Sequence, residues 1–152
     1  MDNNIVEGCI FRNIAAEHID IKEYTTGQKI FGCTFYEDGM TWENLAGSFI
    51  DIAGNNCYIH DNVGYRNKNK KIIAAFDVHR IVDEWGDGHK FIYNVVYMDR
   101  PYGEVDNNRR MYVVDEWALK FSVKSNKVDY GKGLVYANSW EYFNSDLVTY
   151  LE

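Results

Sequence analysis

This sequence has almost no proline, no long apolar run and no signal peptide. A single proline among 152 residues leaves no proline-rich linker between two cores, so one domain covering residues 1–152 is expected. No apolar run reaches the roughly 18 residues that a membrane-spanning helix needs, so no membrane partner is expected. The first five residues lack the basic start and apolar stretch of a signal peptide, so the chain as it stands carries no export signal.

Positive charge is also scarce. The chain has 16 Lys and Arg residues against 23 Asp and Glu, and its net charge of −7 argues against a nucleic-acid partner, which would need a concentrated basic face. The one basic cluster, Lys68, Lys70 and Lys71, is too small to change this and is interpreted as a solvated turn. The three cysteines are widely spaced, unlike the tight pairs of a zinc site, and are expected to be buried thiols.

An internal repeat predicts the fold. Five segments each begin with an apolar residue and carry Cys or Asn at the fourth position, at intervals of 24, 29, 32 and 32 residues (33 − 9, 62 − 33, 94 − 62 and 126 − 94). Periods of this length are typical of solenoids. The sequence therefore predicts an all-β, right-handed parallel β-helix of about five rungs. The segments are Val6–Phe11, Ile30–Phe35, Ile59–Gly64, Phe91–Val96 and Val123–Val128.

The Cys and Asn positions are expected to form a ladder along the coil. Equivalent residues of stacked rungs lie about 4.8 Å apart, so each Asn amide can hydrogen-bond to the next and satisfy polar groups at the bend. Cysteine can enter such a column as a small side chain that tolerates burial. Cys9 and Cys33 would lie on adjacent rungs, close enough for a disulfide without requiring one. The ladder residues are Cys9, Cys33, Asn62, Asn94 and Asn126.

A second set of strands alternates apolar, acidic and apolar residues. On stacked strands their Asp side chains would stand about 4.8 Å apart on one outward face, where they could share a cation such as Ca²⁺. The alternative is a solvent face balanced by nearby basic residues, and charged clusters are more often of this kind. The column consists of Asp20 in Ile19–Ile21, Asp51 in Ile50–Ile52 and Asp77 in Phe76–Val78.

The last residues, 139–152, are expected to cap the coil. Their apolar residues recur at helical spacing, which predicts a short amphipathic helix over residues 141–151. A strand is the alternative, because Val148, Thr149 and Tyr150 favour β structure. The helical spacing rests on Trp140, Phe143, Leu147 and Leu151.

Five stretches carry a family resemblance: Glu17–Gly27, Gly39–Met40, Ser48–Asn56, Asp77–Arg80 and Trp85–Gly86. Together they resemble the C-terminal portion of a family of right-handed parallel β-helix proteins in the pectate-lyase-like superfamily. The resemblance implies a secreted, extracellular, carbohydrate-associated protein of lyase-like type, here without the N-terminal rungs, signal peptide and cap of full-length relatives. Where family members tend to carry Asp-Val-Lys-Gly, this chain has Ala53 in place of the Lys.

Basic residues follow the Asp column. Lys22 and His79 each lie two residues after an Asp of the column, on the same face, and Arg80 is adjacent. Polyuronate lyases neutralise the substrate carboxylate with a cation while a basic side chain removes the neighbouring proton. Lys22, His79 and Arg80 are therefore the candidate base and carboxylate partners.

An acidic pair precedes a tryptophan twice, in Asp83–Trp85 and Asp115–Trp117. An aromatic face beside carboxylates suits a sugar ring, although rung-edge packing of half-buried Trp is an equally good interpretation. The other histidines, at 18, 60 and 89, have no metal-ligand spacing and are interpreted as structural. The candidate polysaccharide-binding residues are Glu23, Asp83, Glu84, Trp85 and Trp117.

Two functions are compatible with these features. The first is a lyase-like or hydrolase-like enzyme that acts on a polysaccharide along the flank of the β-helix. The second is a non-catalytic glycan-binding or structural module of a larger surface or viral assembly, because fold alone does not decide function. The first rung has no segment to cover it, so pairing with a second copy or a partner segment is expected there.

Overall fold

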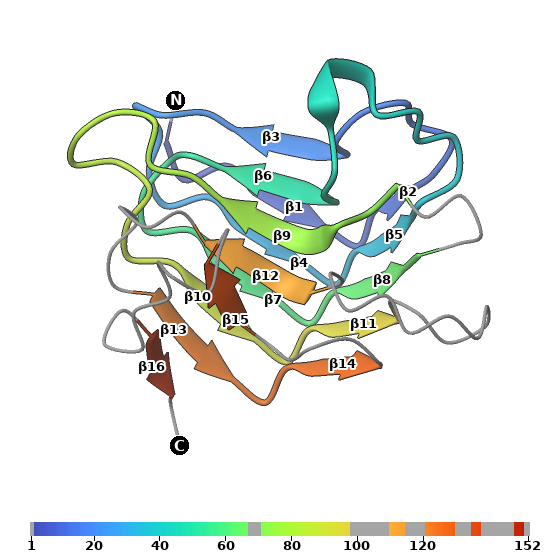
Figure 1. Cartoon of the computed structure of the whole chain (residues 1–152). Coiled ribbons are helices and arrows are strands. Elements are labelled where there is room, and N and C mark those ends of the chain that lie inside the picture. Colours follow the sequence, from blue (N-terminus) through green and yellow to red (C-terminus); the bar gives the residue numbers. More distant parts are fainter. Residues whose placement is uncertain are drawn as a thin grey trace.

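The chain coils into a parallel β-helix (Figure 1). The computed structural model describes residues 2–66, 71–97, 110–114, 121–129, 135–137 and 148–150. Within these residues the strands form three parallel sheets, and one short 3₁₀ helix, η1 at Glu43–Leu45, is the only helical element. The predicted all-β parallel β-helix is therefore confirmed. No helix in the described part of the chain is long and apolar enough to cross a bilayer.

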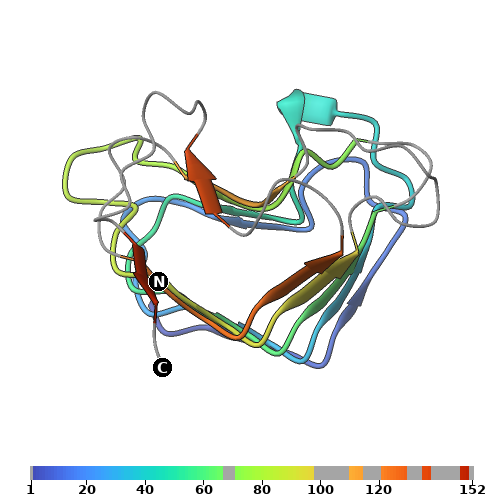
Figure 2. The same ribbon diagram turned by 60° about the horizontal axis from the view of Figure 1, so that its bottom comes forward.

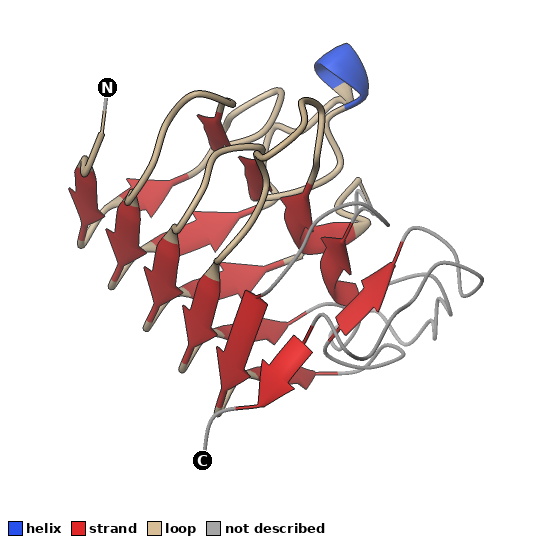
Figure 3. Cartoon of the chain, turned by 90° about the vertical axis from the view of Figure 1, so that its left-hand side faces the viewer, coloured by secondary structure: helices blue, strands red, loops and turns tan. Residues whose placement is uncertain are grey.

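Each rung contributes one strand to each sheet, and the strands of successive rungs stand in columns (Figure 3). Sheet A contains β1 (Ile5–Glu7), β4 (Lys29–Phe31), β7 (Tyr58–His60), β10 (Lys90–Ile92), β13 (Phe121–Lys124) and β16 (Val148–Tyr150). Sheet B contains β2 (Ile10–Phe11), β5 (Thr34–Tyr36), β8 (Val63–Tyr65), β11 (Val95–Tyr97) and β14 (Lys127–Asp129). Sheet C contains β3 (Ile19–Ile21), β6 (Ile50–Ile52), β9 (Ala74–Val78), β12 (Arg110–Val114) and β15 (Val135–Ala137).

The strand register follows the repeat in the sequence. The first apolar residues of the five segments pair in one continuous column of sheet A. Because side chains alternate across a strand, this register turns the same apolar positions of every rung into the coil, where they form one core. The paired residues are Val6, Ile30, Ile59, Phe91 and Val123.

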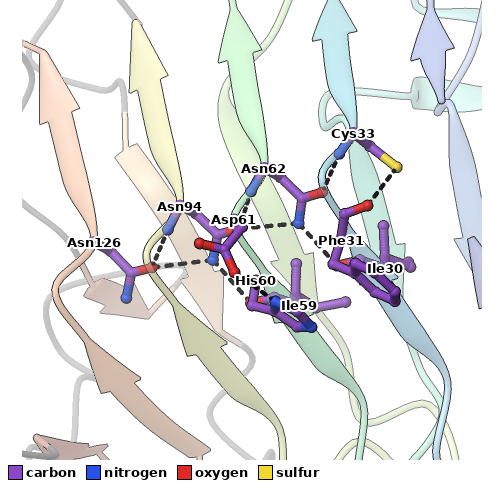
Figure 4. A network of polar contacts seen from close by, with 9 residues as sticks. All are labelled: Ile30, Phe31, Cys33, Ile59, His60, Asp61, Asn62, Asn94 and Asn126. Carbon is purple, nitrogen blue, oxygen red and sulfur yellow. Dashed lines mark hydrogen bonds and ion pairs between the residues drawn. The ribbon is translucent and has the colours of Figure 1, made fainter. Parts of the chain in front are cut away.

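The predicted Asn ladder lies inside the coil at the bend between sheets A and B (Figure 4). Asn62 Oδ1 accepts the Cys33 N–H at 3.0 Å, and Asn62 Nδ2 donates to the Ile30 carbonyl at 2.9 Å. Asn62 Nδ2 also lies 3.0 Å from Asn94 Oδ1, and Asn94 Nδ2 repeats the contact with Asn126 Oδ1 at 3.0 Å. Each buried amide thus satisfies backbone groups of the rung before it.

The cysteines divide between the core and the surface. Cys33 and Cys57 are buried, as predicted, and burial raises the pKa of both thiols, that of Cys57 to about 12. Cys9 is exposed, so the prediction of a buried thiol is wrong there. The reason is that β2 stands at the edge of sheet B, with a neighbouring strand on one side only. All three thiols are free.

A second buried polar column lies where the chain enters sheet A. Gln28 Oε1 accepts the Asn4 N–H at 2.8 Å, and two rungs further on His89 Nδ1 accepts the Cys57 N–H at 3.3 Å. His89 is 0% exposed. Its burial lowers its pKa to about 4, although the Gly86 backbone acts on the pKa in the opposite direction. His89 is therefore a neutral core residue at physiological pH.

The C-terminal cap differs from the helix that the apolar spacing predicts. Residues 148–150 form β16, which pairs in parallel with β13 at the end of sheet A. The helix predicted over residues 141–151 is therefore wrong at these three positions, and the strand alternative is confirmed there. The β-branched Val148 and Thr149 fit a pleated sheet edge better than a helix. Residues 139–147 lie outside the described part of the chain.

The first rung leaves three strand edges and a hollow open. β1, β2 and β3 stand at the edges of their sheets, and Ile5 and Ile10 are 59% and 69% exposed. A hollow of about 330 Å³ opens between β1 and β3, lined by apolar residues such as Val6, Ile19 and Ile21. Edge strands of this kind can pair with another chain. Pairing with a second copy or a partner segment at this rung stays a prediction.

Candidate functional site on sheet C

The acidic column lies on the outer face of sheet C. Asp20 pairs with Asp51 and Asp51 pairs with Asp77 in the strand register, as the sequence predicts. The Ile residues on either side of Asp51 are fully buried, so alternation along β6 turns Asp51 outward. On the next two rungs the residues in register with Asp77 are Val113 and Tyr136, so the column of acidic residues is three rungs long.

Two basic side chains contact this column. Lys22 Nζ contacts Asp20 Oδ2 at 2.6 Å. His79 Nε2 lies 3.1 Å from Asp51 Oδ1 and 3.5 Å from Asp77 Oδ1, so it bridges two rungs. The hydrogen bond with Asp20 raises the pKa of Lys22, so this ammonium is charged at neutral pH and holds its proton tightly.

Ala53 follows β6 directly, just as Lys22 follows β3 and His79 follows β9. Ala53 N donates to the Ile21 carbonyl at 2.7 Å, and His79 N donates to the Ile52 carbonyl at 2.9 Å, so the two residues occupy equivalent positions. Ala53 is 3% exposed and supplies no cation. Asp51 of the middle rung is contacted instead by His79 of the next rung.

Glu17 is a member of the site that the sequence did not reveal. Burial raises its pKa, and the negative charges of Asp51 and Asp20 raise it further, while its own backbone hydrogen bond and Lys22 lower it. Glu17 thus lies beside the column and keeps a proton more readily than an ordinary carboxyl. It precedes β3, outside the alternating pattern that identified the three Asp residues, so the strand period gave no signal for it.

The column as arranged does not fit a calcium ion. Ca²⁺ takes six to eight oxygen ligands, whereas here an ammonium and an imidazole already contact all three carboxylates. Among the residues whose side chains are described, no group of three or more His, Cys, Asp or Glu is arranged to hold a metal ion. Calcium therefore enters no step of the function proposed below.

We expect millimolar Ca²⁺ to leave the melting temperature of the chain unchanged, because Lys22 and His79 already contact the three carboxylates. Thermal unfolding followed by circular dichroism, with Ca²⁺ and with EDTA, measures this. A ligand that binds the folded state raises the melting temperature by mass action. A rise in Ca²⁺ that the variant Asp51→Ala removes would restore the calcium site predicted from the sequence.

The loop after β9 holds the predicted aromatic residue at the end of the sheet C strands. Trp85 is half-buried and packs edge-on against Tyr24 at 5.4 Å between ring centroids. Asn55 fixes this loop from the rung before, since its Nδ2 donates to the Glu84 carbonyl at 2.7 Å and its Oδ1 accepts the Asp87 N–H at 2.8 Å. Tyr24, 64% exposed, extends the aromatic surface and was not identified from the sequence.

The remaining candidates lie near Lys22, in the loop after β9 or outside the described residues. Arg80 is mostly covered and lies 3.8 Å from the fully exposed Asp83 of its own loop. Glu23 is half-buried and its charge raises the pKa of Lys22, which places it nearby. Trp117, with Asp115 and Glu116, lies outside the residues that the structure describes.

The fold and this outer face define a parallel β-helix with a charged flank on sheet C. No family model and no curated protein matches the chain. The crystal structure of an alginate lyase from Paenibacillus sp. str. FPU-7 is similar, with a TM-score of 0.77 and 37% identity over 88% of this chain. The chain spans 44% of the length of that protein. Over the matched part, the two chains share the same fold.

Proposed function

We propose that this protein binds an acidic polysaccharide of the polyuronate class outside the cell and cleaves it by β-elimination on the outer face of sheet C. The observation that carries the proposal is the contact of His79 with Asp51 and Asp77, on the same column of carboxylates as the contact of Lys22 with Asp20. The similarity to an alginate lyase supports the same class of substrate. This elimination needs a base that removes a proton and a cation that stabilises the substrate carboxylate, and the column holds a histidine and a lysine that can fill these roles.

In the proposed reaction a base removes the proton from the carbon next to the uronate carboxylate. The electron pair of that C–H bond forms a carbon–carbon double bond, the glycosidic C–O bond breaks, and a proton passes to the leaving oxygen. The negative charge that builds up on the carboxylate must be balanced by a cation in the site.

His79 is the proposed base. Because its Nε2 faces Asp51 and Asp77, the ring proton is assigned to Nε2, which leaves the basic lone pair of the neutral ring on Nδ1. The two carboxylates then stabilise the imidazolium that forms when Nδ1 accepts the substrate proton.

Lys22 and Glu17 complete the proposed roles. Since Asp20 raises the pKa of Lys22, this residue is a poor base and a good permanent cation for the substrate carboxylate. Glu17, with its raised pKa, is the proposed proton donor to the leaving oxygen. Arg80 stays a candidate second partner for the carboxylate.

The test is incubation with alginate and with polygalacturonate, with Ca²⁺ or EDTA, while the ultraviolet absorbance of unsaturated products is followed. We expect His79→Gln to lower kcat by about 100-fold or more, the usual effect of losing a general base. Lys22→Gln is expected to raise KM, because it removes the carboxylate partner. Lys90→Gln, which changes an exposed lysine in sheet A, is the matched control and is expected to behave as the parent.

Three results would contradict parts of this proposal. Failure of the parent to bind or cleave any polyuronate would overturn the function as a whole. Release of reducing ends without unsaturated products would replace β-elimination by hydrolysis. Full activity of His79→Gln would remove His79 from the role of base.

A further inference from the structure

The second feature of sheet C is formed by Trp42, η1 and residues 71–73, which lie at the side of the sheet opposite to Trp85. The strands of sheet C are parallel, so η1 before β6 and residues 71–73 before β9 lie where these strands begin, and the Trp85 loop lies where β9 ends. Figure 2 shows η1 and the loop after β9 rising at opposite sides of the sheet. Trp42, just before η1, is 43% exposed although it is a large aromatic residue.

Trp42 is held in place by a chain of contacts that begins in the core. The carboxylate of Glu37, which is 0% exposed, accepts the backbone N–H groups of Lys71 and Ile72. The indole Nε1–H of Trp42 donates to the Lys71 carbonyl. Next to these contacts, Ile73 N donates to the Gly47 carbonyl at 2.7 Å, which joins the two segments again. The position of the indole is therefore set before any ligand arrives.

The same arrangement places a cation on the indole. Lys71 Nζ lies 4.8 Å from the centre of the Trp42 ring. Lys71 also ends the one basic cluster of the sequence, in a chain whose net charge is −7. The Asp column repels an anionic polymer except where the Lys22 ammonium covers it, so a separate positive region is needed to hold the other carboxylates of the polymer.

We propose that Trp42 and Lys71 form a subsite for one uronate residue of the polysaccharide, away from the reacting sugar. The indole packs against the apolar C–H surface of the sugar ring, and the Lys71 ammonium pairs with its carboxylate. The five residues of β9 span about 17 Å at about 3.3 Å per residue. The subsite lies at the start of this strand and Trp85 follows its end, so the strand length separates them. This inference rests on the proposed function and assigns a role to Lys71.

The test compares binding of alginate oligosaccharides with binding of the same oligosaccharides after their carboxylates have been reduced to alcohols, by isothermal titration calorimetry. Lys71→Gln is expected to raise Kd for the charged oligosaccharides about fivefold, the value of one exposed ion pair, and to leave Kd for the reduced ones unchanged. Trp42→Ala is expected to raise both Kd values about tenfold. Trp42→Phe, which keeps an aromatic face, serves if the Ala variant fails to fold, with a smaller rise expected for both ligands.

The controls separate this subsite from the function on which it rests. Lys90→Gln changes an exposed lysine away from sheet C and is expected to bind as the parent does. If the parent binds uronate oligosaccharides and Lys71→Gln binds them equally well, the subsite is overturned and the proposed function stands. An equal loss of charged and reduced ligands in Lys71→Gln would also overturn it, because that loss would be structural. A parent that binds no uronate oligosaccharide would overturn both proposals.

Discussion

Replacing Asn62 with Leu is expected to lower the free energy of unfolding by about 3–5 kcal/mol, because it removes several hydrogen bonds to buried polar groups. The Cys33 N–H and the Ile30 carbonyl both lose the hydrogen bond that the Asn62 amide provides, and Asn94 Oδ1 loses one of its donors. Leu cannot replace any of these contacts. Urea denaturation followed by circular dichroism measures the difference, and a change below about 1 kcal/mol would contradict the structural role of the ladder.

The matched variant is Cys33→Asn, which extends the ladder by one rung. Cys33 Sγ already faces the Val6 carbonyl at 3.7 Å, in the place where the Asn62 amide donates to the Ile30 carbonyl. An Asn at this position is expected to donate there and to Asn62 Oδ1, and to stabilise the fold by about 1 kcal/mol. Opposite signs for the two variants would establish that the amide, rather than the volume of the side chain, carries the effect.

Acidification from pH 7 to pH 4 is expected to remove about 3 kcal/mol of stability through His89 alone. The pKa of this buried imidazole falls from 6.5 to about 4 in the folded state. Below pH 6.5 the unfolded chain therefore binds a proton that the folded chain does not, and stability is lost as the pH falls through this window. A shift of about 2.5 pKa units at about 1.4 kcal/mol each gives the stated magnitude.

The control for this prediction is His89→Gln, since Gln28 accepts a backbone N–H at the corresponding place two rungs earlier. The variant is expected to fold and to show a flatter dependence of unfolding free energy on pH between 6.5 and 4. The comparison is made between parent and variant because other groups titrate in this range. Burial also lowers the pKa of His18, which acts in the same direction, whereas the raised pKa of Glu17 acts in the opposite one. Parallel pH profiles would contradict the assignment to His89.

The contact of His79 with Asp51 and the contact of Lys71 with Trp42 each join residues that are far apart in the sequence. His79 contacts Asp51 because β6 and β9 are neighbours in sheet C. Lys71 lies against Trp42 because the buried Glu37 carboxylate accepts the backbone N–H of Lys71 and so fixes this segment. No local pattern encodes these distances. The exposure of Cys9 likewise depends on the position of β2 at a sheet edge, and residues 148–150 form a strand because β13 offers an edge to pair with.

The sequence by itself determined the coil, the register of its strands, the internal Asn ladder and the outward column of Asp20, Asp51 and Asp77. This was possible because every rung of a parallel β-helix repeats the same local pattern. Side chains alternate along each strand and the same kind of residue recurs at each bend, so the sequence shows which side chains face the core and which face solvent. Only the tertiary structure decided which cation contacts each carboxylate and where Glu17 and Trp42 lie. Those residues come from connecting segments, which have no repeat, and packing alone brings them to the face of sheet C.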